Sequence, residues 1–390
     1  MRKTFSAIII LLAFIICVGC MGMHQKAKAF ADGVIDTSSK SALLMDADTK
    51  TIVYSSNENL HLPIASMNKI MTLLLCFEEI DNGNLSFDED VLVSKNASGM
   101  GGSQIFLEDG ATYKVEELIK GIVVASANDA CVALAERLYG SEENFVQKMN
   151  EKAYNLNMNN TNFVNCTGLP KSGQFSCAKD VALMFSELIK HKDYFRFSNI
   201  WLDEISHPND RKTQITNTNK LVRFYEGCDS GKTGFTSEAG HCLTASAIRN
   251  GTRLIAVVIS APDSKTRFYE VSQMFNYGFS NYQTKVVINN DTPLEIPVSI
   301  VGGKKDCVSV VAESPIKVFC KKNEQRAFEI DFNPVEKVKA PIYKGDILGV
   351  VSIYENGLEI DKVNVLANED VLSKTYFDYV LDISNNWALI

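Results

Sequence analysis

The spacing of hydrophobic residues predicts a region of mixed helices and strands in the first part of the chain. Helices are expected at 70–77, 115–138, 145–156, 178–190 and 263–282. Strands are expected at 41–45, 51–54, 242–248 and 252–260, and the last two meet at Asn250-Gly251, a strong hairpin signal. Strands at both ends with helices between them predict an α/β (α+β) domain over residues 30–283, in which helices pack on an antiparallel sheet.

The pattern changes after this region. Residues 284–371 contain short runs rich in Val and Ile, separated by turns with Gly, Pro and Asn, and Glu355-Asn356-Gly357 has the form of a hairpin tip. This texture predicts a small, separate all-β C-terminal domain. We recognise no set of catalytic residues in it.

The N-terminus has the features of a secretory signal over residues 1–29. Arg2 and Lys3 precede the uncharged apolar run Ala7–Val18, and Ala27-Lys28-Ala29 supplies a cleavage site. An uncleaved anchor is the alternative, although the run is short for a full membrane span. A lipoprotein site at Cys20 is less favoured, because Cys17 stands where Leu is expected. We therefore expect an exported protein at the outer face of the cytoplasmic membrane or in the cell-wall space.

Residues 372–390 predict an amphipathic C-terminal helix. Apolar residues recur at helical spacing along it, at Tyr376, Val380, Ile383, Trp387 and Ile390. Such a helix could lie in the bilayer interface as a peripheral anchor, or it could dock on the β domain.

Charge and cysteine content narrow the function. The net charge of the full chain is −8, and removal of residues 1–29 takes away four basic residues and no acid. A strongly acidic exported protein is a poor candidate for nucleic-acid binding. Eight cysteines lie beyond the signal, so disulfides are permitted. No Cys-x-x-Cys pair or Cys/His cluster is present, so we predict no metal site.

The first candidate for chemistry is Ser66-Met67-Asn68-Lys69, which opens the apolar run after Pro63. On a helix, positions three apart share a face, so the Lys69 amine would reach the Ser66 hydroxyl. A serine is a poor nucleophile until a base takes its proton. Apolar neighbours would lower the pKa of Lys69 and suit it to that task. Ser-x-x-Lys also occurs by chance, as at Ser314-Pro315-Ile316-Lys317.

Two shorter motifs follow. Ser126-Ala127-Asn128 interrupts an apolar helical segment, where buried polar groups need partners, although a helix cap would explain it too. Lys232-Thr233-Gly234 precedes the strand pair, and a strand edge with a Gly for close approach suits an extended peptide. The alternative for Lys232 is a solvated turn.

Ser-x-x-Lys, Ser-x-Asn and Lys-Thr-Gly in this order resemble the three motifs of penicillin-recognising serine enzymes. The surrounding sequence is similar to the D-alanyl-D-alanine carboxypeptidases, the low-molecular-mass penicillin-binding proteins. The resemblance extends over nearly the whole mature chain. It is carried by residues 63–72, 121–131, 160–163, 173–176, 217–219, 231–240 and 340–346. Two departures are Ala127, where Gly is common, and Lys179 before Asp180, where the family usually has Arg.

The resemblance implies a catalytic group. Ser66 would attack the carbonyl of a D-Ala–D-Ala peptide bond at the end of a peptidoglycan stem peptide, with Lys69 as the base. Ser126, hydrogen-bonded between Lys69 and Lys232, would pass the proton to the leaving D-alanine. Water would then release the acyl group, and the reaction would require no cofactor. β-Lactams would acylate Ser66 as inhibitors.

The resemblance also implies a substrate-binding group. Asn128 would hold the substrate amide and the Lys69 side chain. The backbone N–H groups of Ser66 and Phe235 would form the oxyanion hole, beside Gly234. Lys232, Thr233 and Arg267 would hold the terminal carboxylate. Alternatively, Arg267 would pair with Asp263 or Glu270 on its own helix.

Three other functions remain to be weighed. A β-lactamase of the class that uses a glutamate-activated water would need an acid after Ser-x-Asn, and residues 155–177 contain no Asp or Glu. A DD-endopeptidase that cuts crosslinks is chemically closer to the favoured reading. A silent cell-wall binding module is disfavoured because Ser66, Lys69 and Lys232 are all present.

Overall fold

The computed structural model describes residues 35–335 and 338–387. The expected signal segment, residues 1–29, lies outside the described residues, as does Ile390.

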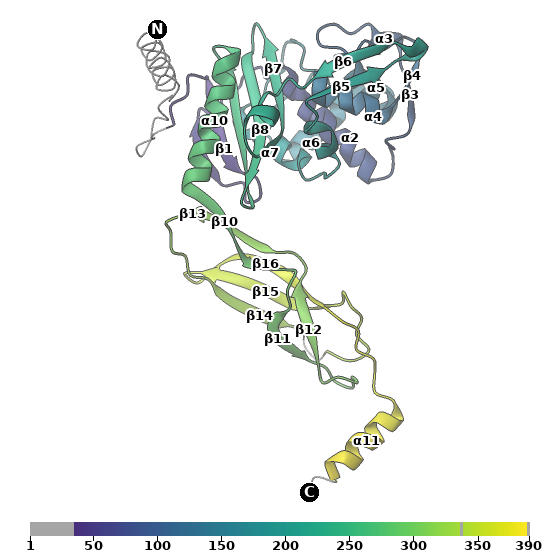
Figure 1. The fold of residues 1–390 in the computed structure, drawn as a ribbon, viewed down its shortest axis with the longest axis vertical. Helices are drawn as coiled ribbons and strands as arrows, with labels where there is room; N and C mark the ends of the chain where they lie inside the picture. Colours follow the sequence, from purple (N-terminus) through teal and green to yellow (C-terminus); the bar gives the residue numbers. More distant parts are fainter. Residues whose placement is uncertain (1–34, 336–337, 388–390) are drawn as a thin grey trace, which may run out of the picture. The chain divides into compact units, whose positions relative to one another are not determined.

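Five antiparallel strands form the sheet around which the first region is built (Figure 1). They run in the order β2 (Ile52–Ser56), β1 (Ser41–Asp46), β9 (Thr252–Ala261), β8 (Gly240–Arg249) and β7 (Cys228–Thr236). The expected hairpin at Asn250-Gly251 joins β8 to β9, and both residues have the positive φ that such a turn needs. The strand that carries Lys232-Thr233-Gly234 is therefore the edge strand of this sheet.

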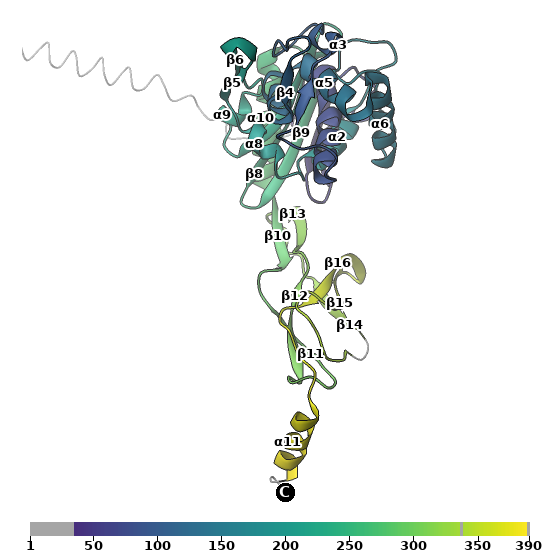
Figure 2. The same cartoon turned by 90° about the vertical axis from the view of Figure 1, so that its right-hand side faces the viewer.

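Helices cover both faces of this sheet, because its central strands are apolar on both sides. On one face, a Cβ at Gly278 of α10 (Ser264–Asn281) would lie 2.4 Å from Leu254 and 3.1 Å from Leu44, so helix and sheet are in close contact. On the other face, Leu43, Met45 and their neighbours in β9 belong to the main hydrophobic core. Figure 2 shows α10 and α2 on different sides of β9. The expected α/β (α+β) layering is confirmed.

The second helical layer supplies most of that core. It contains η1 (Ala65–Asn68), α2 (Lys69–Asp81), α4 (Val115–Lys120), η2 (Gly121–Ala125), α5 (Asn128–Tyr139), α6 (Glu142–Asn155) and α7 (Ala178–Leu188). The shorter elements are β3 (Asp90–Leu92), α3 (Lys95–Ser98), β4 (Thr112–Lys114), α8 (Tyr194–Ser198), β5 (Leu202–Ser206), η3 (Pro208–Asp210), β6 (Lys212–Thr216) and α9 (Leu221–Phe224). Most aliphatic residues of α2 and α5 are almost fully buried, as their apolar sequences predict, and Ile80 and Leu138 at the helix ends are partly buried.

One local prediction was wrong in detail. Ser66 and Lys69 were expected on one helix, but Ser66 lies in a 3-10 turn, η1, and the α-helix begins only at Lys69. Ala65 has φ +48°, so the chain enters this turn through a left-handed residue.

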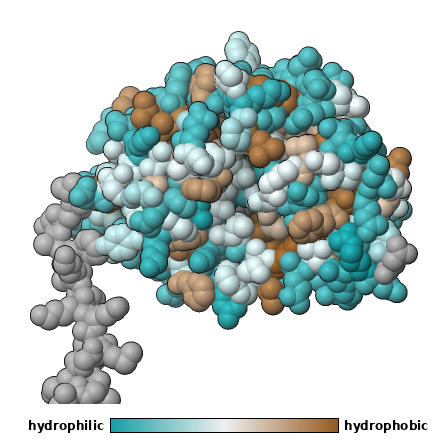
Figure 3. Space-filling model, turned by 90° about the horizontal axis from the view of Figure 1, so that it is seen from above, coloured by the Kyte–Doolittle hydropathy of each residue, from teal (hydrophilic) through white to brown (hydrophobic). Residues whose placement is uncertain are grey.

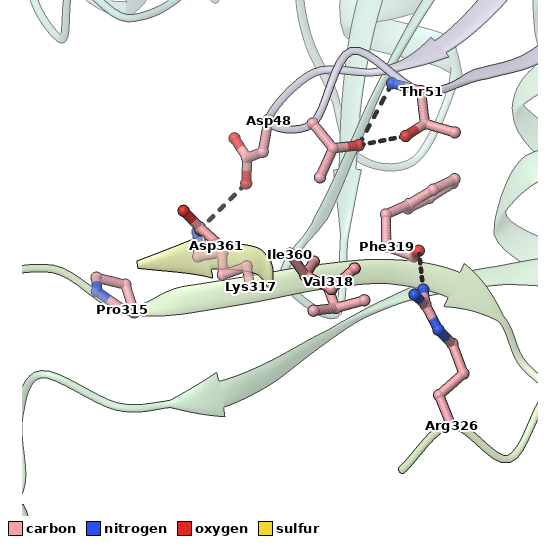
Figure 4. Close-up of a pocket in the computed structure, with 10 residues that line it drawn as sticks. Asp48, Thr51, Pro315, Lys317, Val318, Phe319, Arg326, Ile360 and Asp361 are labelled. Carbon is pink, nitrogen blue, oxygen red and sulfur yellow. Dashed lines mark hydrogen bonds and ion pairs between the residues drawn. The ribbon is translucent and has the colours of Figure 1, made fainter. Parts of the chain in front are cut away.

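The later region is all-β, as expected. Its larger sheet has the order β11 (Leu294–Ser299), β12 (Cys307–Ala312), β16 (Leu358–Ala367), β15 (Ile347–Glu355) and β14 (Glu329–Pro334). A two-stranded sheet pairs β10 (Tyr282–Ile288) with β13 (Ile316–Lys321). The expected turn at Asn356-Gly357 joins β15 to β16. After β13, the Arg326 guanidinium donates to the carbonyl oxygen of Phe319 (Figure 4).

The last element, α11 (Tyr376–Trp387), is the amphipathic helix predicted from the sequence. Its apolar side chains are exposed, including Tyr376, Phe377 and Leu381. Across residues 35–335 and 338–387, no helix combines the length and hydropathy that a membrane span requires. On the face shown in Figure 3, hydrophobic residues form small separate patches among hydrophilic ones.

Candidate active site

The three motifs come together from three separate segments of the chain. Ser66 lies on η1, Lys69 begins α2, Ser126 and Asn128 flank the junction of η2 and α5, and Lys232 lies on β7. The sequence separations of the motifs are large, so the tertiary fold brings them together.

Lys69 reaches the nucleophile as the spacing predicted. Its Nζ lies 3.0 Å from Ser66 Oγ, and Ser66 is half-buried, whereas Lys69 is fully buried. The amine also donates a hydrogen bond to the carbonyl oxygen of Thr167, at 2.5 Å. One N–H is thereby committed to a neutral acceptor, which leaves the nitrogen lone pair available to the Ser66 hydroxyl.

Burial sets the protonation of this amine. Loss of hydration lowers the pKa of Lys69 below its ordinary value, and the carboxylate of Asp129 opposes this only weakly. A lowered pKa increases the fraction of neutral amine near neutral pH, which is the form that can accept the Ser66 proton.

Ser126 sits at a strained corner. The π-helical turn η2 ends there, and Ser126 adopts a left-handed conformation with φ +63°. A non-glycine residue in this region costs of the order of 1–3 kcal/mol and is typically found at functional sites. The corner exposes the hydroxyl to Lys232, whose Nζ donates to Ser126 Oγ at 2.7 Å. Neither Ser126 nor Asn128 caps the helix, which was the alternative explanation of the motif. Ala127 occupies the N-cap position of α5.

Lys232 is not on a solvated turn. Its side chain is only 2% exposed. Burial lowers its pKa well below the ordinary value, and the nearby charge of Lys69 lowers it further. The two serine hydroxyls of the motifs are thus each bonded to a buried lysine. The hydrogen bond expected between Ser126 and Lys69 is not among those formed by the described residues.

Gly234 allows β7 to approach the nucleophile. A Cβ at this position would lie 2.6 Å from the carbonyl oxygen of Ile64 and 3.2 Å from Ser66 N. Any side chain would push the edge strand away from the turn that carries Ser66. The next residue, Phe235, is 57% exposed, so the strand edge beside Ser66 is open to an approaching peptide.

Asn128 is held by the loop that precedes it in the sequence. Its Nδ2 donates to the carbonyl oxygen of Gly101 at 2.6 Å, and its own N–H donates to Ser103 O. Its Oδ1 is buried and has no hydrogen-bond partner in the described structure. Such an atom is costly unless a ligand satisfies it, so it suits a substrate amide. The expected contact with Lys69 is absent here, and Thr167 takes that role.

Arg267 forms no ion pair with Asp263 or Glu270, the two partners that were considered as an alternative to substrate binding. Asp263 caps α10 through Lys265 N and Thr266 N, and Glu270 accepts from Ser38 and Ser39. The Arg267 guanidinium donates to the carbonyl oxygens of Gly234 at 3.0 Å and Cys242 at 3.2 Å.

Those two bonds hold the guanidinium against the strand of the Lys-Thr-Gly motif. Within the described residues it has no carboxylate partner, so its charge is not neutralised.

Sequence reasoning missed two supporting groups. One is the carbonyl oxygen of Thr167. Every residue has a main-chain carbonyl, so the sequence does not indicate which one accepts a hydrogen bond from Lys69. The other is Asp129, a fully buried carboxylate that accepts the N–H groups of Ile105, Leu107 and Ala130. Asp129 directly follows Asn128, so its adjacency to the motif was the available signal.

The cysteines in the described part of the chain do not form disulfides. All eight described cysteines are free, and Cys307 alone among them is exposed. Burial raises the pKa of Cys131 to about 12, so this thiol beside the lysines stays protonated. No group of three or more His, Cys, Asp or Glu side chains with metal-site geometry occurs in the part of the chain that the structure describes.

Comparisons with known proteins agree with the motifs. A family model described as D-alanyl-D-alanine carboxypeptidase matches residues 25–263, and one for the C-terminal domain of penicillin-binding protein 5 matches residues 282–373. The D-alanyl-D-alanine carboxypeptidase DacF of Bacillus subtilis is 39% identical over 356 residues, which cover 90% of each chain. The D-alanyl-D-alanine endopeptidase of Escherichia coli is 31% identical over 245 residues, covering 61% of this chain and 76% of the relative.

Solved structures give the same result. The D-alanyl-D-alanine carboxypeptidase DacD from Francisella tularensis matches with a TM-score of 0.66 at 27% identity, covering 90% of this chain and 98% of the other. Penicillin-binding protein 5 from Haemophilus influenzae matches with a TM-score of 0.68 at 27% identity, covering 87% and 99%.

The buried amine of Lys69 predicts a pH-dependent cost to stability. Because the folded-state pKa lies below the ordinary value of 10.5, the unfolded chain binds more protons between those two values. Within that window, wild-type stability should rise by about 1.4 kcal/mol per pH unit relative to Lys69→Met, and below it the difference should be constant. Urea unfolding of both proteins from pH 6 to 10 measures this.

The exposed Lys179 supplies the control for that experiment. Lys179→Met should differ from wild type by the same amount at every pH. A flat difference for Lys69→Met would show that the folded and unfolded chains protonate Lys69 alike.

Proposed function

Since the chain belongs to the D-alanyl-D-alanine carboxypeptidase family, the low-molecular-mass penicillin-binding proteins, we propose that Ser66 is the nucleophile with which it removes the terminal D-alanine of peptidoglycan stem peptides. The observation that carries the assignment is the buried Lys69 amine 3.0 Å from a half-buried Ser66 hydroxyl. The protein is a serine-type hydrolase that binds β-lactams and acts on peptidoglycan in the periplasm or cell-wall space.

Acylation begins with proton transfer from Ser66 Oγ to the neutral Lys69 amine. The oxygen attacks the carbonyl carbon between the two D-alanines, and the bond to the leaving nitrogen breaks once that nitrogen is protonated. Ser126 donates its hydroxyl proton to that nitrogen, while Lys232, bonded to Ser126 at 2.7 Å, holds the hydroxyl in place. The proton that Lys69 took from Ser66 replaces the one that Ser126 gave up, so Lys69 is neutral again when water attacks the ester. Water then hydrolyses the ester, releases the shortened peptide and restores Ser66.

Substrate alignment follows from the edge strand. An extended peptide lying along β7 presents its scissile carbonyl to the N–H groups of Ser66 and Phe235, with Gly234 leaving space between them. The unpaired Oδ1 of Asn128 accepts the N–H of a substrate amide. These contacts direct the carbonyl carbon toward Ser66 Oγ.

Recognition of a free chain end distinguishes a carboxypeptidase from an endopeptidase. Lys232, Thr233 and Arg267 lie on or against β7, and Arg267 has no carboxylate partner among the described residues. A guanidinium binds a carboxylate through two parallel hydrogen bonds, which a lysine cannot do. Cleavage of crosslinks is the second candidate function, because one of the relatives is a D-alanyl-D-alanine endopeptidase.

Membrane attachment through α11 is a further part of the proposal. The two aspartates of its polar face are paired, Asp378 with Lys304 at 3.6 Å and Asp382 with Lys374 at 2.9 Å. Pairing reduces the repulsion that anionic lipid would exert on them, and the apolar face stays exposed. Trp387, expected at headgroup level, has a side chain outside the described residues. We also propose cleavage of the signal after residue 29 and domain limits of 30–283 and 284–371.

The nucleophile can be tested by labelling with a fluorescent penicillin. Ser66→Ala should abolish covalent labelling, because Ser66 is the hydroxyl that lies beside Gly234 at the open strand edge and one turn before a buried lysine. Lys69→Ala should stay folded and acylate more slowly by several orders of magnitude. Labelling of Ser66→Ala at the wild-type rate would assign the nucleophile elsewhere.

Arg267 can be tested with peptides ending in D-Ala–D-Ala, either with a free carboxylate or amidated. Arg267→Ala should lower kcat/KM for the free peptide by about ten- to several-hundred-fold, as expected for ~1.5–3 kcal/mol from a charge-assisted bond. The amidated peptide should be a poor substrate already and should lose little more. Equal cleavage of both peptides by wild type would favour the endopeptidase function.

The role of α11 can be tested with vesicles of phosphatidylethanolamine and phosphatidylglycerol. The mature chain should sediment with them, whereas deletion of residues 372–390, or Phe377→Ser with Leu381→Ser, should leave it in the supernatant. Tyr343→Ser, at another exposed aromatic, is the control and should still bind. Binding by the deletion variant would exclude α11 as the anchor.

A further inference from the structure

A tight turn over residues 165–169 holds the carbonyl that accepts the Lys69 hydrogen bond, and the Asn165 side chain builds this turn. Its Oδ1 accepts from Gly168 N at 2.7 Å and from Thr167 N and Oγ1, both at 3.3 Å. Its Nδ2 donates to the carbonyl oxygen of Leu169 at 2.9 Å. Asn165 is 7% exposed, so these bonds are sheltered from water.

The same turn is joined to the helix that carries the base. Three consecutive carbonyl oxygens each accept one hydrogen bond from that helix or its first turn. Asn68 Nδ2 donates to Asn165 O at 2.6 Å, Thr72 Oγ1 to Cys166 O at 2.6 Å, and Lys69 Nζ to Thr167 O at 2.5 Å. The turn is therefore fixed in register against α2.

Gly168 brings the turn against the nucleophile as well. It has φ +82°, and a Cβ there would lie 2.0 Å from the carbonyl oxygen of Ala65. A larger residue would separate the turn from η1. The Thr167 carbonyl is thus placed between the segment that carries Ser66 and the amine that activates it.

We propose that Asn165 is a positioning residue for the general base. By holding the Thr167 carbonyl, it fixes the direction of one Lys69 N–H, and the remaining lone pair then points to Ser66 Oγ. Without this anchor, the amine can rotate about its last bonds, and the fraction of conformers competent for proton transfer falls. This inference rests on the role of Lys69 proposed above.

The titratable groups that face Lys69 come from three elements. Asp129 and Cys131 lie on α5, Cys166 lies on the turn itself, and Lys232 approaches from β7. The turn supplies no carboxylate, since residues 155–177 contain neither Asp nor Glu. A neutral Asn165 builds the turn without adding a charge that would favour the protonated amine.

Acylation by a β-lactam can separate positioning from binding. Asn165→Ala should lower the acylation rate constant by about ten- to a hundred-fold while the dissociation constant of the preceding complex stays within about two-fold. Asn162→Ala, on the same segment but bonded to Gly173 O, should match wild type. If Asn165→Ala does not fold, Asn165→Ser, which keeps one acceptor oxygen, serves in its place. An unchanged rate constant, or equal losses in both constants, would overturn the proposal.

A charge placed on the turn gives a second measurement, the pH dependence of acylation. This pH dependence would not change if Asn165 had a merely structural role. In Asn165→Asp, a carboxylate close to Lys69 should favour the protonated amine, so the acid limb of the acylation profile should move up by about half to one pH unit. Asn162→Asp, with the same change of charge at a half-buried site, should not move it. Superimposable profiles for Asn165→Asp and wild type would overturn the proposal.

The proposed role of Lys69 as the general base is tested separately. If Lys69→Ala acylates at the wild-type rate, the proposed function of Lys69 fails. If Lys69→Ala is inactive and the Asn165 variants behave as wild type, the positioning role alone fails.

Discussion

The site depends on two lysine amines that the fold takes out of water. Lys69 is fully buried and Lys232 is 2% exposed, and each contacts a serine hydroxyl. A buried ammonium loses hydration that few neighbours replace, so both pKa values fall. The two amines also disfavour each other's charge. Burial of the two amines makes the folded state less stable, and it increases the fraction of Lys69 that is neutral and able to act as the proposed base.

Close backbone approach is what makes this burial possible. The edge strand β7 meets η1 at Gly234, and the turn at Gly168 meets η1 at Ala65. Both contacts are too close for a side chain. They enclose the Ser66 turn between a strand edge and a loop, which excludes water from the Lys69 side while the Ser66 hydroxyl stays accessible. On the third segment, Ser126 at the end of η2 has a strained, left-handed backbone conformation.

Sequence reasoning found the layered fold because hydrophobic period and turn residues are local signals. The Asn250-Gly251 hairpin and the Ser66–Lys69 spacing needed no tertiary information. The unpredicted features are relations between distant segments. The Thr167 carbonyl has no side-chain signature, and the route of the Arg267 guanidinium to Gly234 O depends on how α10 crosses the sheet. The 3-10 turn at Ser66 differs from the expected helix because β7 and the 165–169 turn constrain that segment.

The identity of the acceptor on Lys69 has a chemical consequence for the second half of the reaction. A carboxylate in place of the Thr167 carbonyl would both raise the pKa of the amine and offer a second base to activate water. The turn has no such group, and Asp129 commits its carboxylate to three backbone N–H groups. In the proposed reaction, Lys69 is then the base for hydrolysis of the ester as well as for acylation. One amine therefore serves both steps of this proposed reaction, because the turn beside it carries no second base.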